Sequence, residues 1–205
     1  GSSWYALTGG TWLIGGARYY FDTDCNMVKG LYVNPAGKKF YANSDGTLLQ
    51  SQWLTYNGAR YYFGSSWYAL TGGTWIIDGN RYYFDTECNM VVGLYQNPSG
   101  KFYYGNADGV LAKNEWIEVD GYWYYFGPSW YALAGGPTEV DAEMYYFDDD
   151  DCTMQIGLII GGDGHLYFAD DNGALVKQDW RTVESDTYYF GQNYYALTGG
   201  TWVIS

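Results

Sequence analysis

The sequence places cysteine, its most reactive residue type, in one recurring context. Arg18 to Met27 reads RYYFDTDCNM and Arg81 to Met90 reads RYYFDTECNM, so Cys25 and Cys88 each follow a tyrosine-rich run. A thiol in such a place could be a nucleophile, a metal ligand or half of a disulfide. Because the whole context recurs, and Cys152 follows a third similar run, the pattern indicates a structural repeat rather than a catalytic centre.

Other residue types that carry catalysis are scarce or occur at repeating positions. His165 is the only histidine, which leaves no Ser-His-Asp set and no histidine-rich metal set to assign. The acidic run from Asp148 to Asp151 lacks the alternating ligand spacing of a calcium loop. Four further carboxylates fall at repeating turn positions, where such side chains cap their own backbone: Asp22, Asp45, Asp85 and Asp108. The sequence therefore predicts no catalytic residue, no metal, no cofactor and no enzymatic activity.

An internal duplication organises the whole chain. Laying the sequence on itself at an offset of 63 gives about 41 identities between residues 1–63 and 64–126. We interpret residues 1–205 as a single repeat domain with blocks 1–63, 64–126 and 127–190 and a partial fourth block, 191–205. Both ends fall inside a repeat, which is expected of a piece excised from a longer protein.

Each block contains a finer period of 20 to 22 residues, marked by an aromatic triplet such as Tyr61-Tyr62-Phe63. Turn pairs such as Asn57-Gly58 precede most triplets and favour type I′ turns between antiparallel strands. A lone hairpin is marginal in water, so about nine such units must stack on one another. With aromatic residues at 21% and 29 glycines, the sequence predicts an all-β solenoid of stacked β-hairpins.

This architecture bears directly on the cysteines. If hairpins stack at about 10 Å, thiols three hairpins apart lie roughly 30 Å apart, whereas a disulfide needs Cα atoms within about 7 Å. We therefore expect three free thiols and no metal site shared between them.

The unit of an aromatic residue, a Gly turn, Tyr-Tyr-Phe, a second turn and Met or Leu resembles the cell-wall-binding or choline-binding repeat. Related repeats form the glucan-binding tails of glucosyltransferases and the receptor-binding tails of clostridial toxins. The resemblance implies a non-catalytic, secreted module at a bacterial surface, which targets an attached enzyme or toxin domain to a polysaccharide.

In choline-binding members the ligand lies in an aromatic cage between successive hairpins. One wall comes from the first strand, one is a Trp just before Tyr-Tyr-Phe, and one comes from the next hairpin. Quaternary ammonium groups are attracted to such π faces. In this sequence Arg18, Arg60 and Arg81 replace the second Trp, and a cation there would repel choline. Only Trp123 fits, so Trp116, Trp123 and the following hairpin could still form one choline-like pocket.

The arginines favour the carbohydrate-binding relatives, because a pyranose offers an apolar face to aromatic rings and hydroxyl groups to arginine. The third block has Thr138 and Ile159 in place of first-strand aromatics, so the weakest sites are expected near residues 138–160. Most Tyr and Trp side chains are expected in the core. The candidate ligand-binding residues are Trp12, Arg18, Tyr20, Trp53, Arg60, Tyr62, Trp75, Arg81, Tyr83, Trp116, Trp123, Tyr125, Trp180 and Trp202.

The net charge of −13 restricts the partners. It repels nucleic acid and anionic lipid surfaces, and no run of about 18 apolar residues could insert into a membrane. The expected partner is a polysaccharide or cell-wall glycan, with choline on teichoic acid as the alternative. A structural or adhesive array that binds protein or itself is a third hypothesis. The sequence leaves the oligomeric state and the glycan open.

Overall fold

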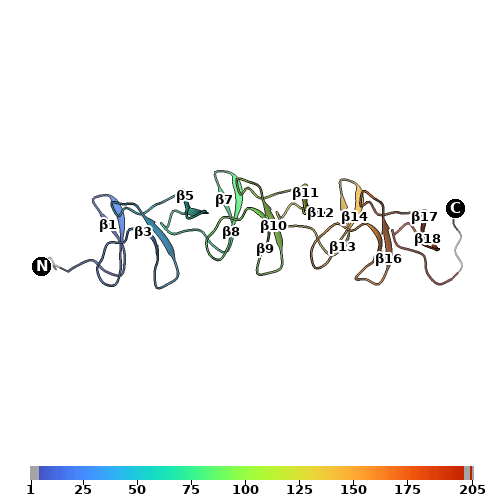
Figure 1. Cartoon of the computed structure of the whole chain (residues 1–205), viewed down its shortest axis with the longest axis horizontal. Coiled ribbons are helices and arrows are strands. Elements are labelled where there is room, and N and C mark those ends of the chain that lie inside the picture. The colour runs from blue at the N-terminus through green and yellow to red at the C-terminus, as the bar shows by residue number, and fades with distance from the viewer. Residues whose placement is uncertain (1–4, 201–203, 205) are drawn as a thin grey trace. The chain divides into compact units, whose positions relative to one another are not determined.

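The computed structural model describes residues 5–200 and 204, and its regular structure consists of β-hairpins. Within these residues nine antiparallel hairpins follow one another in sequence (Figure 1), and each forms its own two-stranded sheet. The strands are β1 (Gly10–Ile14), β2 (Ala17–Phe21), β3 (Gly30–Val33), β4 (Lys39–Ala42), β5 (Gln52–Tyr56), β6 (Ala59–Phe63), β7 (Gly73–Ile77), β8 (Asn80–Phe84), β9 (Gly93–Gln96), β10 (Phe102–Gly105), β11 (Glu115–Val119), β12 (Tyr122–Phe126), β13 (Gly136–Val140), β14 (Glu143–Phe147), β15 (Gly157–Ile160), β16 (Leu166–Ala169), β17 (Asp179–Val183) and β18 (Asp186–Phe190). The predicted all-β solenoid of hairpins is confirmed.

The turn chemistry explains why these segments fold as hairpins. Asn57 and Gly58, between β5 and β6, have φ angles of 50° and 80°. Asp120 and Gly121, between β11 and β12, have 53° and 85°. Two successive positive φ angles are what a type I′ turn requires, and its twist matches that of the flanking strands. The turn pairs therefore fix the register in which each aromatic triplet faces its partner strand.

Consecutive hairpins within a unit are joined by side-chain packing and by backbone hydrogen bonds. The triplet phenylalanines Phe63, Phe84, Phe126, Phe147 and Phe190 are fully buried. The amide of Met90, which follows β8, donates to the carbonyl of Arg60 on β6 at 2.8 Å. Burial of the aromatic face against the next hairpin supplies the stabilisation that a lone hairpin lacks.

Between successive hairpins, large side chains lie beside small ones. Met27 lies against Gly46, where a Cβ atom would collide with the Met27 sulfur, and Met90 lies in the same way against Gly109. At the turn position that these glycines occupy, the hairpin of β7 and β8 has Cys88, with a positive φ of 68°. The larger Cys88 side chain lies in a buried cluster with the small Ala69 instead of a methionine. The side chain that follows one hairpin therefore matches in size the turn residue of the next.

The chain divides into two compact units. The first comprises Gly1–Gly93 and Gly105–Leu111, and the second comprises Leu94–Tyr104 and Ala112–Ser205. Each unit holds its own aromatic clusters. A single repeat domain over residues 1–205 stays a prediction. Within residues 5–200 and 204, no helix is long and apolar enough to cross a membrane.

All three cysteines are free thiols, with Cys25 exposed and Cys88 and Cys152 buried. Burial raises the pKa of Cys88, and burial together with Asp151 and Asp148 raises the pKa of Cys152 to about 11. Because only the thiolate reacts, we expect a disulfide reagent at pH 8 to modify Cys25 first and Cys152 at least about 100-fold more slowly. Complete denaturation should make the three rates equal. Three equally fast thiols in the native chain would contradict the burial.

Candidate functional site

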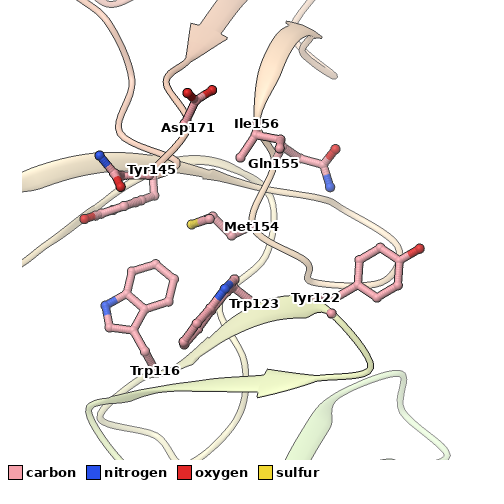
Figure 2. A pocket seen from close by; sticks show the side chains of 10 residues that line it. Trp116, Tyr122, Trp123, Tyr145, Met154, Gln155, Ile156 and Asp171 are labelled. Atoms are coloured by element: carbon pink, nitrogen blue, oxygen red, sulfur yellow. The ribbon is translucent and has the colours of Figure 1, made fainter.

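The hairpin of β11 and β12 places two tryptophans on one face. Trp116 pairs with Tyr125, and two residues further along β11 Glu118 pairs with Trp123. Because side chains alternate across a strand, Trp116 and Trp123 project from the same side of the hairpin. Figure 2 shows the two indole rings beside each other at one edge of a pocket.

The next part of the chain supplies the opposite walls. Tyr145 on β14 lies with its ring centroid 4.8 Å from that of Trp116, at an interplanar angle of 65°. Met154, in the loop after β14, points into the pocket (Figure 2), and its amide donates to the carbonyl of Trp123 at 2.8 Å. Gly173 leaves room for the Met154 side chain, since a Cβ atom at Gly173 would overlap the Met154 sulfur. Three rings and a thioether thus surround one space.

The pocket has a volume of about 790 Å³, within the usual range of ligand pockets. The other lining residues are Gly121, Tyr122, Gln155, Ile156, Asp171 and Asn172. Asp171 brings a carboxylate, and no lysine or arginine lines the pocket. Burial, and then the carboxylates of Glu143, Asp170 and Asp141, raise the pKa of Tyr145, so its hydroxyl stays neutral. Aromatic faces with one carboxylate suit a cation that carries apolar substituents.

The structure separates the predicted first-strand tryptophans into two groups. Trp53 and Trp116 pair with the second tyrosine of their triplets, Tyr62 and Tyr125. Trp12 pairs instead with Tyr19, the first tyrosine of its triplet. A shift of one residue turns a side chain to the other face of the sheet. Trp12 therefore does not occupy the position in its hairpin that Trp116 occupies in the pocket.

The second group shares features besides this register. Trp75 pairs with the first tyrosine of its triplet, Tyr82, and is 42% exposed, as is Trp12. The indole nitrogens of Trp12 and Trp75 donate to the carbonyls of Thr8 and Thr71 at 3.4 Å. These two tryptophans form matching exposed surfaces at equivalent places of two blocks.

The predicted arginines cover aromatic rings or bond to their own hairpins. The guanidinium carbon of Arg18 lies 4.2 Å from the Trp67 ring centroid, and that of Arg60 lies 4.4 Å from the centroid of Trp53. Arg81 donates to the Thr74 hydroxyl at 3.0 Å. The charges of Arg18 and Arg60 therefore lie against aromatic rings of the first unit, and Arg81 is bonded to its own hairpin.

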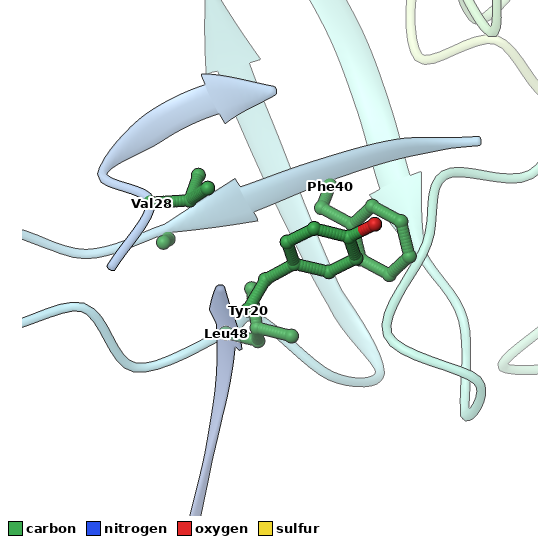
Figure 3. Packing of buried hydrophobic residues seen from close by; sticks show 5 residues of the cluster. Tyr20, Val28, Phe40 and Leu48 are labelled. Atoms are coloured by element: carbon green, nitrogen blue, oxygen red, sulfur yellow. The ribbon is translucent and has the colours of Figure 1, made fainter. Parts of the chain in front are cut away.

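The remaining predicted residues take several places. Tyr20 is buried in a core cluster with Val28, Phe40 and Leu48 (Figure 3), and Tyr83 is buried as well. Trp180 is 53% exposed. Tyr62 and Tyr125 pack edge-on against Trp53 and Trp116, and Trp202 lies outside the described residues. Of the predicted residues that the structure describes, Trp116 and Trp123 alone line the pocket.

Three lining residues, Tyr145, Met154 and Asp171, were not among the residues predicted for the site. The tyrosines predicted for the site were each the second tyrosine of an aromatic triplet. Tyr145 is instead the first tyrosine of Tyr145-Tyr146-Phe147. Part of the pocket, namely Tyr145, Met154, Gln155 and Ile156, comes from the stretch 138–160 where the weakest sites were expected. The two tryptophan walls come from the preceding hairpin, so the missing aromatics at Thr138 and Ile159 do not affect them.

The other groups of chemical interest form structural contacts. His165 lies with its Nδ1 atom 2.9 Å from Asp163 and stacks on Tyr195 at 4.1 Å. The Tyr167 hydroxyl donates to Asp163 at 2.7 Å, and this bond, with those from His165, lowers the pKa of Asp163 to about 2. Asp148 accepts the amides of its own turn. No group of three potential metal ligands occurs among residues 5–200 and 204.

The predicted turn carboxylates mostly cap their own backbone. Asp22 and Asp85 each accept two backbone amides, and Asp45 accepts the amide of Thr47. In the turn that contains Asp108, the accepting side chain is instead that of Asn106. The carboxylates of Asp22, Asp45 and Asp85 are therefore explained by turn structure, whereas the prediction that Asp108 caps its turn is wrong because Asn106 does so.

Repeated aromatic hairpins with a caged pocket define a repeat-built binding module. Residues 7–53 match the family model of the choline-binding repeat, and residues 51–66 and 114–129 match the putative cell wall binding repeat. The predicted resemblance to the cell-wall-binding and choline-binding repeat superfamily is confirmed over these matched residues. No curated protein sequence matches the chain.

Solved structures agree with this assignment. Choline binding protein F from Streptococcus pneumoniae is similar at 26% identity and a TM-score of 0.74, over 95% of this chain and 81% of that chain. A second structure of that protein, in the presence of a peptidoglycan analogue, gives 26% and 0.73 over the same shares. A structure of CbpF in complex with ipratropium gives 25% and 0.73, over 95% and 82%.

Proposed function

We propose that this chain is a non-catalytic cell-surface module that binds choline-type quaternary ammonium groups in the pocket of Trp116, Trp123, Tyr145 and Met154. The observation that carries the proposal is the convergence of three aromatic rings on one space that no lysine or arginine lines. The ligand's natural source would be choline on the teichoic acid of a bacterial cell wall. In a secreted protein, such a module would bring an attached domain to that surface.

The chemistry of the pocket selects this ligand class. A quaternary ammonium has no N–H donors, loses little hydration and is attracted to the negative faces of aromatic rings. Met154 adds a polarisable thioether, and Asp171 adds a carboxylate at the rim. The net charge of −13 further favours a cation over an anion. Each wall contributes about 0.5–2 kcal/mol, so after the cost of association we expect a dissociation constant on the order of 1 mM.

The comparisons support the same class. Choline binding protein F is named for its ligand, and ipratropium, found in a complex with CbpF, carries a quaternary nitrogen. The presence of a peptidoglycan analogue in another structure agrees with a cell-wall target. These relatives support the proposal through their fold and repeats, and the pocket supports it through its own geometry.

Calorimetric titration of the whole chain with matched ligands tests the proposal. Choline should bind at one site, and 3,3-dimethyl-1-butanol, its neutral isostere, should bind at least about 10-fold more weakly because it lacks the cation–π attraction. Ethanolamine should also bind more weakly, since its hydrated ammonium keeps its N–H groups. Tryptophan fluorescence should change with choline in parallel. Equal affinity for choline and its neutral isostere, or no choline binding, would refute the assignment.

A carbohydrate ligand remains the second candidate, favoured by the exposed rings of Trp12 and Trp75. These rings are separate from the pocket and present flat apolar faces, which suit a pyranose. If they bind a glucan or a cell-wall glycan, the glycan should alter tryptophan fluorescence without competing with choline. Concentration-dependent association with no response to either ligand class would instead favour an adhesive array.

A further inference from the structure

The first unit contains a near copy of the pocket walls. Trp53 and Tyr82 lie with ring centroids 4.9 Å apart at 67°, against 4.8 Å and 65° for Trp116 and Tyr145. Trp53 also lies 5.9 Å from Phe84, as Trp116 lies 5.8 Å from Phe147. Each of these two centroid distances thus differs by only 0.1 Å between the two places.

The thioether is repeated as well. Met90 lies against Gly109 in the first unit as Met154 lies against Gly173 in the second, each with its sulfur next to the glycine Cα hydrogen that a Cβ atom would replace. The amide of Met90 donates to the carbonyl of Arg60 at 2.8 Å, and that of Met154 to the carbonyl of Trp123 at the same distance. The backbone therefore offers Arg60 the place that Trp123 takes in the pocket.

Arg60 is what distinguishes the two places. Its guanidinium carbon lies 4.4 Å from the centroid of the Trp53 ring, and its Nη1 atom donates to the carbonyl of Asp108 at 3.3 Å. Among the described residues Arg60 forms no ion pair with a carboxylate. Its charge is therefore balanced by the aromatic face and the carbonyl oxygen.

We infer that Arg60 is a tethered cation that occupies and closes an ammonium cage formed by Trp53, Tyr82 and Met90, and so determines how many ligand sites the chain presents. This inference rests on the proposed choline function. A group held on the same chain acts at an effective concentration of about millimolar or more, so it competes successfully with a weakly bound free ligand. It also repels any second cation. The first unit is thereby held together without ligand, whereas the corresponding cage of the second unit is open.

The test is to convert one cage into the other. Arg60→Trp should open the cage of Trp53, Tyr82 and Met90 in the first unit, so that calorimetry finds two choline sites instead of one. The double variant Arg60→Trp with Trp123→Arg should return the count to one, now in the first unit. The indole N–H resonance of Trp53 should move on choline addition in both variants but not in the parent chain. A folded Arg60→Trp chain with one site and an unmoved Trp53 resonance would overturn the inference.

A matched control uses the same replacement where the register is different. Arg18→Trp also exchanges an arginine before Tyr-Tyr-Phe, but Trp12 in that hairpin pairs with Tyr19, so no second site should form. Gain of a site in Arg18→Trp would show that any added tryptophan binds choline and would overturn the role of the cage. Circular dichroism verifies that each variant is folded.

If Arg60→Trp does not fold, Arg60→Gln removes the charge and keeps a side chain that can donate to Asp108. Choline should then move the Trp53 resonance, though with weaker affinity than at the second-unit pocket, and an unmoved resonance contradicts the inference. The parent chain distinguishes this outcome from a failure of the proposed function. No binding by the parent refutes the choline function itself, whereas one site in the parent and no gain in the variants refutes only the role of Arg60.

Discussion

Trp123→Arg is expected to abolish choline binding while the chain stays folded. Trp123 is 41% exposed, so its replacement disturbs little of the core. It is one of three aromatic walls, and loss of a desolvated cation–π contact of about 2 kcal/mol weakens binding roughly 30-fold. The introduced guanidinium adds repulsion, because it would cover Trp116 as Arg60 covers Trp53.

Calorimetry with choline measures this loss. Ile160→Arg is the matched control, because it adds the same charge to the second unit at a side chain that is 82% exposed and does not line the pocket. The control should bind choline within about twofold of the parent. Trp123→Phe, which keeps an aromatic face, should retain more affinity than Trp123→Arg. Unchanged binding by Trp123→Arg would show that choline does not use this pocket.

Phe84→Ala should lower the free energy of unfolding of the first unit by about 3–5 kcal/mol. The Phe84 side chain is fully buried and clusters with Ile77, Tyr82 and Met90. Its removal leaves a cavity between two hairpins, and neither hairpin has a second core with which to compensate. Because each hairpin is stabilised mainly by its neighbours, the loss should spread to β5 and β6.

Denaturant unfolding followed by tryptophan fluorescence measures the change. Ile76→Ala serves as the control, because Ile76 lies on the same hairpin but is 65% exposed. Its effect should stay within about 0.5 kcal/mol. A similar small effect for Phe84→Ala would mean that the hairpins do not depend on this packing.

The fold follows from the sequence because each local signal is repeated and agrees with the others. Turn pairs such as Asp120-Gly121 specify the hairpins, and aromatic triplets specify the buried faces. Trp123 stands out in sequence because it alone has the residue type that a cage requires at that position. One pocket at Trp116 and Trp123 was therefore predictable from the residue pattern.

The rest of the site depends on register, which sequence alignment alone did not resolve. Trp12 and Trp116 align as first-strand aromatics, yet a shift of one residue relative to the triplet places them on different faces. The third wall, Tyr145, belongs to another hairpin. Its selection over Tyr146 depends on which face meets the preceding hairpin. The contact of Arg60 with Trp53 likewise depends on the direction of a long side chain.

The size matching between successive hairpins limits how an array of this kind can change its length. Met27 requires a glycine at the next turn, Gly46, while Trp67 stands at the corresponding turn one hairpin further on, with a positive φ of 66°. Deleting a single 21-residue unit would bring Trp67 against Met27, where even a Cβ atom does not fit. Removing or adding three hairpins, about 63 residues, would preserve every match. The block of three is therefore the smallest segment that could be inserted or deleted without repacking.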